Sequence, residues 1–375
     1  MEKSVFKRKI YNEILEWKEN RSDKYALLIK GARRIGKSTI AKEFAEKEFK
    51  SYILIDFAHT SKEIIELFDD MYNLDFFFLQ LQQFTGVRLY ENESVIIFDE
   101  VQLLPKARQT IKYLVADGRY KYIETGSLLS IKKNTKDILI PSEEHKISMY
   151  PMDFEEFLWA IDDTMTADTI KLLMKSKKPA GNALHRNLMR TFRLYMLIGG
   201  MPQAIESYLE SNNLQVVDEV KREIIDLYEE DFIKIDGTGL AGDIYDAIPA
   251  NLSSNASRYI LSTAKKGIRS NRVRELIPDM LSSFTVNIAY HANKYLHFRL
   301  NCCVWVKFLN PLAQIIEAFL CKWCECIEVL AIKILSKDNV VHPYAVIVVL
   351  THAITQNPKI AQVHPVCRFV LDSAK

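Results

Sequence analysis

The first 300 residues of this 375-residue chain contain no cysteine, which excludes a disulfide framework over most of its length. The chain also lacks net charge, because 50 basic residues stand against 48 acidic ones. Bulk attraction to nucleic acid or to an anionic membrane is therefore not expected. No apolar stretch follows Lys7 and Arg8, so the N-terminus does not read as a signal peptide, and no repeat or low-complexity tract occurs. We expect a globular cytoplasmic protein.

The most informative segment that is present is a glycine-rich loop. Residues 31–38 read Gly-Ala-Arg-Arg-Ile-Gly-Lys-Ser, the pattern G-x-x-x-x-G-K-[ST] of a phosphate-binding P-loop, or Walker A motif. Its two glycines let the backbone curl, so that consecutive N–H groups point at phosphate oxygens. Lys37 would bring a positive charge to the β- and γ-phosphates, and Ser38 a hydroxyl to Mg²⁺. The predicted nucleotide-binding residues are Gly31, Ala32, Arg33, Arg34, Ile35, Gly36, Lys37, Ser38 and Thr39.

The flanks of the loop have the pattern that a P-loop requires. Residues 25–29 form a short apolar run that predicts a buried parallel strand. After the loop, Ile40, Ala41, Phe44 and Ala45 follow a helical spacing. The alternative is a basic turn bounded by glycines that binds no ligand.

A second buried strand is predicted at residues 95–98, and it ends in Asp99 and Glu100. The carboxyl ends of parallel strands meet the ligand in an open α/β sheet. We assign Asp99 to the Mg²⁺ held by Ser38, the Walker B role, and Glu100 to polarising the attacking water. The alternative is a solvated strand end. Gln102 is either a further polar contact or a surface residue.

Two more strands are expected, at residues 51–57 and 120–124. Thr125 and Ser127 follow the latter and could contact the γ-phosphate, although Thr, Gly and Ser are also common in plain turns. Strands alternating with helices predict an α/β fold, a parallel sheet sandwiched by helices.

ATP hydrolysis is the favoured reaction. The chain lacks the Asn-Lys-x-Asp segment by which GTPases read the base, and no Asp-x-x-Gly follows the acidic pair. An acid beside the Mg²⁺ ligand suits water as the nucleophile better than a small-molecule acceptor. Arg33 and Arg34 either touch phosphates or are solvated. The predicted catalytic residues are Glu100, Lys37, Thr125 and Ser127, and the predicted metal ligands are Ser38 and Asp99.

These motifs resemble the prokaryotic AAA-type ATPases that join a P-loop domain to a C-terminal domain of unknown function. Two further segments carry the resemblance, Ile147–Phe157 and Tyr195–Gln203, and the match runs from about residue 5 to about residue 295. The resemblance implies ATP and Mg²⁺ as cofactors, hydrolysis, and a winged-helix-like segment after the ATPase core. It implies no substrate.

The expected domains follow from these patterns. They are a P-loop ATPase domain (1–158), which begins with an amphipathic helix at 4–19, a helical region (159–235), a winged-helix-like segment (236–295) and an atypical tail (296–375). Within 253–275 basic residues outnumber acids, so this segment could contact DNA phosphates or form a solvated face.

The tail differs in residue usage from the rest of the chain. It holds all six cysteines, at positions 302, 303, 321, 324, 326 and 367. Zinc is not expected, because no second pair of ligands follows at the required spacing, and Lys322, Glu325 and Glu328 interrupt any membrane span. The strand-rich, nuclease-like region that usually ends the similar ATPases has no counterpart here. A shifted reading frame with poor order, or true divergence, would produce this change.

Taken together, the sequence predicts an ATP-binding protein that acts as a nucleotide-driven switch. It would be a Mg²⁺-dependent ATPase that is slow without a protein partner. The alternatives are a nucleotide-gated DNA-binding regulator, a small-molecule phosphotransferase, or a decayed ATP-binding remnant.

Overall fold

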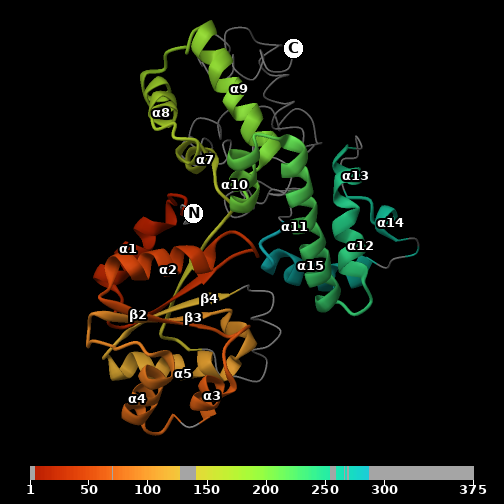
Figure 1. The fold of residues 1–375 in the computed structure, drawn as a ribbon. Helices are drawn as coiled ribbons and strands as arrows, with labels where there is room; N and C mark the ends of the chain where they lie inside the picture. The colour runs from red at the N-terminus through yellow and green to blue at the C-terminus, as the bar shows by residue number, and fades with distance from the viewer. Residues whose placement is uncertain are drawn as a thin grey trace, which may run out of the picture.

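A five-stranded parallel sheet is the centre of the fold (Figure 1). The structure, a computed structural model, describes residues 5–69, 71–126, 141–253, 259–265, 267 and 270–286. The strands are β1 (Ala26–Lys30), β2 (Ser51–Asp56), β3 (Ser94–Asp99), β4 (Lys121–Gly126) and β5 (Glu144–Ser148). Their order is β2-β3-β4-β1-β5. The strand of the P-loop and the strand of the acidic pair are therefore separated by β4 alone.

Four of the five strands were predicted, and three of them (β1, β2 and β3) contain the apolar runs that are typical of parallel sheets buried on both faces. In β3, Val95 and Ile97 pack into the core on one face, whereas Ile96 and Phe98 pack into the core on the other. The sequence analysis missed β5, which reads Glu-His-Lys-Ile-Ser. It pairs only with β1, and an edge strand can carry such polar residues.

Helices cover both faces of the sheet (Figure 1). Helices α1 (Ile10–Asn20) and α2 (Lys37–Glu48) lie on one face, and α3 (Lys62–Glu66), α4 (Leu74–Thr85) and α5 (Pro105–Asp117) lie on the other. Short 3-10 turns follow α3 (η1, Leu67–Asp69) and β3 (η2, Val101–Leu103). The predicted α/β sandwich is confirmed.

The first helix begins later than predicted. Its buried stripe of Ile10, Ile14 and Trp17 is as expected, but residues 5–8 are not helical. Instead the side chain of Arg8 turns inward and donates to the backbone oxygens of Ile35 and Tyr150.

The helical region packs around a core of its own. It comprises α7 (Phe154–Ala160), α8 (Thr166–Ser176), α9 (Asn182–Ile198), α10 (Pro202–Ser211) and α11 (Leu214–Ile235). Phe157, Tyr195 and Ile205 are buried in this core, and Figure 1 shows α8 and α9 at the end of the region remote from the sheet.

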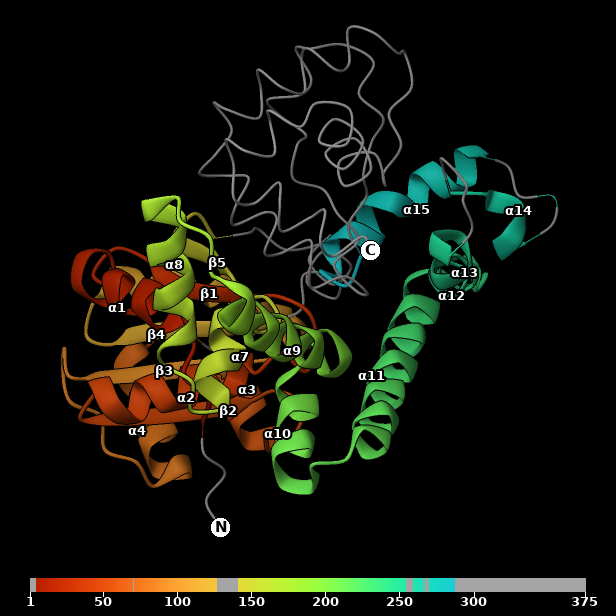
Figure 2. The same cartoon turned by 90° about the horizontal axis from the view of Figure 1, so that it is seen from above.

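From α11 onward the helices join the core of the sheet instead. The side chains of Tyr228 and Phe232 belong to the same buried cluster as Leu27 and Ile29 of β1. The later helices are α12 (Leu240–Asp246), α13 (Ile248–Ser253), α14 (Leu261–Ala264) and α15 (Ser270–Ser282), seen at the far end of α11 in Figure 2. Among the described residues of 236–295 no strand is present, so the winged helix and the domain boundaries stay predictions.

No helix in the described ranges is long and apolar enough to cross a membrane. The predictions for the tail, including its cysteines, fall outside the described residues, as does Ser127.

The two segments that carried the family resemblance meet at a glycine. A Cβ on Gly200, in the turn between α9 and α10, would lie 2.2 Å from the backbone oxygen of Met152. In return, the Met152 amide donates to the Gly200 oxygen over 2.6 Å, and the Tyr195 hydroxyl donates to the Met152 oxygen over 2.8 Å. Only glycine allows this approach without movement of the backbone.

We therefore expect Gly200→Ala to destabilise the protein by about 1–3 kcal/mol, since the added methyl group must push one backbone segment away. Urea unfolding followed by circular dichroism measures the effect. Gly237→Ala is the matched control, because a Cβ there meets nothing within 4 Å and the residue does not have a positive φ. Equal midpoints for the two variants would contradict the expectation.

Candidate nucleotide-binding site

The loop between β1 and α2 curls as the P-loop pattern predicts. Arg34 and Gly36 both have positive φ, 63° and 91° respectively. A Cβ on Gly31 would lie 2.4 Å from the Met149 oxygen, so the first glycine is required by close packing against the residue after β5.

Two carbonyl groups of the loop accept hydrogen bonds from outside it. The Tyr228 hydroxyl of α11 donates to the Arg33 oxygen over 2.7 Å, and Arg8 donates to the Ile35 oxygen over 2.8 Å. In a trans peptide the C=O and the N–H point in opposite directions. The N–H groups of Arg34 and Gly36 therefore point to the inner side of the loop, as a phosphate cradle requires.

Lys37 is buried on the inner side of the loop, with only 5% of its surface exposed. Its ammonium donates to the Ala32 oxygen over 2.8 Å and to the Gly31 oxygen over 3.3 Å. Burial lowers the pKa of Lys37, and the neighbouring Arg33 lowers it further, whereas Glu100 and Asp99 oppose this shift. An anion beside this ammonium would favour its charged form.

Ser38, Asp99 and Thr125 converge from three elements. The Ser38 hydroxyl donates to Asp99 Oδ1 over 2.7 Å, and the Thr125 hydroxyl donates to the same oxygen. Asp99 is the last residue of β3, and Thr125 lies near the end of β4. Mg²⁺ prefers hard oxygen ligands and usually takes one or two from the protein together with phosphate oxygens. The Ser38 hydroxyl and the Asp99 carboxylate fit that requirement.

Glu100 occupies a left-handed backbone position, with φ of 53°, which is uncommon for a residue other than glycine. Its amide donates to the Thr125 hydroxyl over 3.2 Å, and its carboxylate accepts from the Gln102 side chain. Gln102 is only 3% exposed, so the polar-contact alternative for this residue is the one the structure supports. Sequence reasoning did not pair it with Glu100, because the turn that brings the two together was not predicted.

The side chains of the two loop arginines bind partners on the later helices. Arg33 forms an ion pair of 3.1 Å with Asp231 of α11, and Arg34 donates to the Gln203 side chain of α10 over 3.0 Å. The sequence had suggested that these arginines contact phosphates or are solvated, and it had not indicated Asp231 or Gln203 as partners. Thr39 lies in the first turn of α2.

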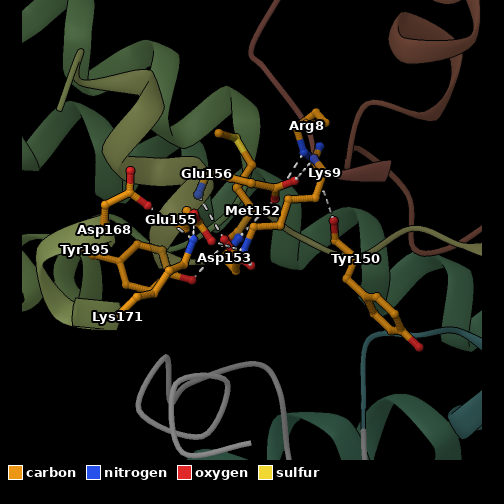
Figure 3. Close-up of polar contacts among 10 residues, drawn as sticks. All are labelled: Arg8, Lys9, Tyr150, Met152, Asp153, Glu155, Glu156, Asp168, Lys171 and Tyr195. Carbon is orange, nitrogen blue, oxygen red and sulfur yellow. Dashed lines mark hydrogen bonds and ion pairs between the residues drawn. The ribbon is translucent and has the colours of Figure 1, made fainter. Parts of the chain in front are cut away.

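The outer side of the loop connects to α7 through a charged junction (Figure 3). Arg8 pairs with Glu156 over 3.3 Å, and both side chains are buried. Glu156 also accepts from the Lys9 amide over 2.6 Å, while its own amide donates to Asp153 in a capping box at the start of α7. The Lys9 ammonium lies 2.5 Å from Asp153 and 2.7 Å from Glu155. The resemblance segment at 147–157 thus anchors the residues that hold the loop.

Comparison with protein families agrees with this geometry. Residues 23–158 match the family model described as AAA domain, and residues 189–297 match Domain of unknown function (DUF8612). We call residues 23–158 the AAA domain after this match. The predicted resemblance to AAA-type ATPases with a C-terminal domain of unknown function is confirmed. A search of curated protein sequences finds no relative.

Solved structures that match this chain include the Walker-type ATPase PABY2304 of Pyrococcus abyssi, at 16% identity and a TM-score of 0.48 over 83% of this chain and 95% of that one. The Holliday junction branch migration motor RuvB of Thermotoga maritima matches at 11% identity and a TM-score of 0.33, over 78% and 94% of the two chains. PCH-2 of C. elegans matches at 14% identity and a TM-score of 0.33, over 57% and 69%.

Behind Thr125, the AAA domain buries a group of charged side chains beneath α5. Glu124 of β4 is fully buried, and neither of its carboxylate oxygens has a hydrogen-bond partner in the described contacts. Arg108 of α5 binds Glu144 of β5 through two hydrogen bonds of 2.7 and 2.8 Å. Burial raises the pKa of Glu124 well above its usual range, and the charge of Glu144 raises it further. The folded protein therefore keeps a proton on Glu124 to higher pH than an unfolded chain does, although Arg108 and Lys146 oppose this shift.

This protonation makes the stability of the AAA domain depend on pH. An unfolded glutamate loses its proton near pH 4.5, whereas the folded Glu124 keeps it to higher pH. Between these two pKa values the folded state binds more protons, so the free energy of unfolding falls as pH rises. Glu124→Gln replaces the protonated acid by a neutral amide of the same shape. We expect the variant to gain stability relative to the wild type as pH rises above 4.5.

Urea midpoints at several pH values measure this difference. Glu91→Gln is the control, because Glu91 is exposed. Parallel pH profiles for wild type and Glu124→Gln would show that Glu124 is ionised in the folded protein.

Proposed function

We propose that this protein binds ATP through residues 31–39 and hydrolyses it with Mg²⁺, as a slow nucleotide-driven switch. The observation that supports the proposal is the meeting of Lys37, Ser38, Asp99, Glu100 and Thr125, which come from three neighbouring strand ends. An inward-facing loop amide, a buried ammonium and a carboxylate beside a hydroxyl are the groups that phosphoryl transfer requires.

Each residue has a distinct role in this proposal. The Arg34 and Gly36 amides and Lys37 hold the phosphates, and Ser38 and Asp99 hold the metal. When bound, Mg²⁺ supplies positive charge that neutralises the phosphate oxygens. Glu100 accepts the proton of the attacking water, and Gln102 orients its carboxylate. The Thr125 hydroxyl donates to Asp99 and accepts from the Glu100 amide. It therefore lies between the metal ligand and the base, where it can respond to the γ-phosphate.

The switch function rests on the partners of the loop arginines. Arg33 is contacted by Asp231 and Tyr228 of α11. Arg34 is contacted by Gln203 of α10. A nucleotide that changes the loop would therefore act on these two helices directly. An ATP-induced change of this kind requires that α10 and α11 contact the two states of the loop differently.

We expect Lys37→Ala to abolish ATP binding, because the phosphates lose their charged contact. Calorimetric titration with MgATP measures affinity, and Lys42→Ala on the exposed side of the same helix is the control. Hydrogen exchange should also show that ATP alters α10 and α11 in the wild type and leaves them unchanged in Lys37→Ala. Unchanged ATP affinity in Lys37→Ala would overturn the binding site.

Glu100→Gln separates binding from chemistry, since the amide keeps the size of the side chain but cannot accept a proton. We expect ATP binding to persist and turnover to fall by about 10²-fold or more. Phosphate release measures turnover, and Glu91→Gln serves as the control. If Glu100→Gln turns over normally while Asp99→Asn is inactive, the base lies elsewhere.

A further inference from the structure

One long stretch of the helical region contains positive charges and no negative ones. Residues 169–205 include four lysines and three arginines, yet the first acid after Asp168 is Glu206. The stretch covers most of α8, all of α9 and the turn into α10. The chain as a whole has a formal charge of only +2, so this local excess is not a consequence of composition. The cations are Lys171, Lys175, Lys177, Lys178, Arg186, Arg190 and Arg193.

The three arginines lie on one face of α9. Their spacings of four and three residues place them in a row along the helix, about 10 Å from first to last. All three are exposed, whereas Phe192, Tyr195 and Ile198 on the opposite face are buried in the core of the helical region. The end of α8 and the segment that leads from it into α9 add the exposed residues Lys175, Lys177 and Lys178. We call these three arginines and three lysines the α9 basic face.

No acid neutralises the α9 basic face within the described part of the chain. Lys171, which is not part of it, pairs with Glu155 and Asp168, but no ion pair joins a described acid to any of the six cations. The basic segment 253–275, in contrast, does form ion pairs with acidic side chains. There Arg272 pairs with Asp236 over 3.2 Å and with Glu275 over 3.0 Å.

The chemistry of the face suits a polyanion. Its exposed neutral neighbours include Asn182 and Asn187, and arginine, lysine and asparagine are the side chains that contact nucleic-acid phosphates. An interface with a protein needs an apolar centre, but Leu197 is the one large apolar side chain that α9 exposes, whereas Phe192, Tyr195 and Ile198 are buried. An amphipathic membrane helix needs those buried side chains free for lipid.

We propose that the α9 basic face binds the phosphate backbone of duplex DNA without reading its sequence. Phosphates follow one another at about 3.4 Å along the axis of each strand, so a row of about 10 Å spans several of them. The proposal does not depend on ATP hydrolysis, and binding is measured without nucleotide.

The experiment is fluorescence anisotropy of a labelled 20-base-pair duplex, titrated with the full chain at several salt concentrations. We expect binding at 50 mM salt that weakens linearly on a log–log plot against salt. Replacing Arg186, Arg190 and Arg193 together by Gln should lower affinity about 10- to 100-fold and reduce the salt slope by about 3. Gln keeps helix propensity, and the thermal midpoint verifies folding.

The control replaces three exposed cations elsewhere, Lys42, Lys62 and Lys112, by Gln, for the same loss of charge. It should retain the affinity and slope of the wild type. Equal weakening in both variants would show general charge attraction and overturn the assignment to α9. Absence of wild-type binding at 50 mM salt would overturn the proposal itself. So would binding to phosphatidylserine vesicles, or an α9-dependent dimer seen by light scattering, without binding to the duplex.

Discussion

The nucleotide site depends on hydrogen bonds that reach the P-loop from outside. Tyr228 and Arg8 hold two loop carbonyls outward, and the planarity of the peptide then turns the adjacent amides inward. The cradle is therefore not a property of residues 31–38 alone. The side chains that form it come from the segment before α1 and from α11, and Glu156 balances the buried charge of Arg8. Tyr228 also belongs to the buried cluster that joins β1 to α11 and the later helices.

The parts of the fold that sequence reasoning could predict are those with local physical signals. β1, β2 and β3 contain continuous apolar runs, and the P-loop and the Asp99–Glu100 pair lie where such strands end. The meeting of Ser38 with Asp99 followed from the rule that parallel strands deliver their carboxyl ends to one edge. The placement of Thr125 beside Asp99 followed from the same rule.

The parts that could not be predicted depend on contacts between distant residues. The edge strand β5 has no apolar run, so pairing with β1 alone makes it a strand. Arg33 and Asp231 are 198 positions apart, and nothing near either residue indicates the other. Gln102 lies close to Glu100 in sequence, but the left-handed turn that joins them was not visible. The charge of α9 was visible, yet only the structure shows that it lies on one exposed face.

The long separation between the loop and its anchors has a consequence for biosynthesis. Domains form as the chain leaves the ribosome, N-terminal parts first. The strands up to β5 are complete by residue 148, but the Tyr228 hydroxyl that fixes the Arg33 carbonyl follows 195 residues after its acceptor. At about 5–20 residues per second, α11 emerges several seconds after β5. During that interval a nascent chain has the strands of its sheet and a P-loop without one of its anchors, so the geometry of the loop is completed late in translation.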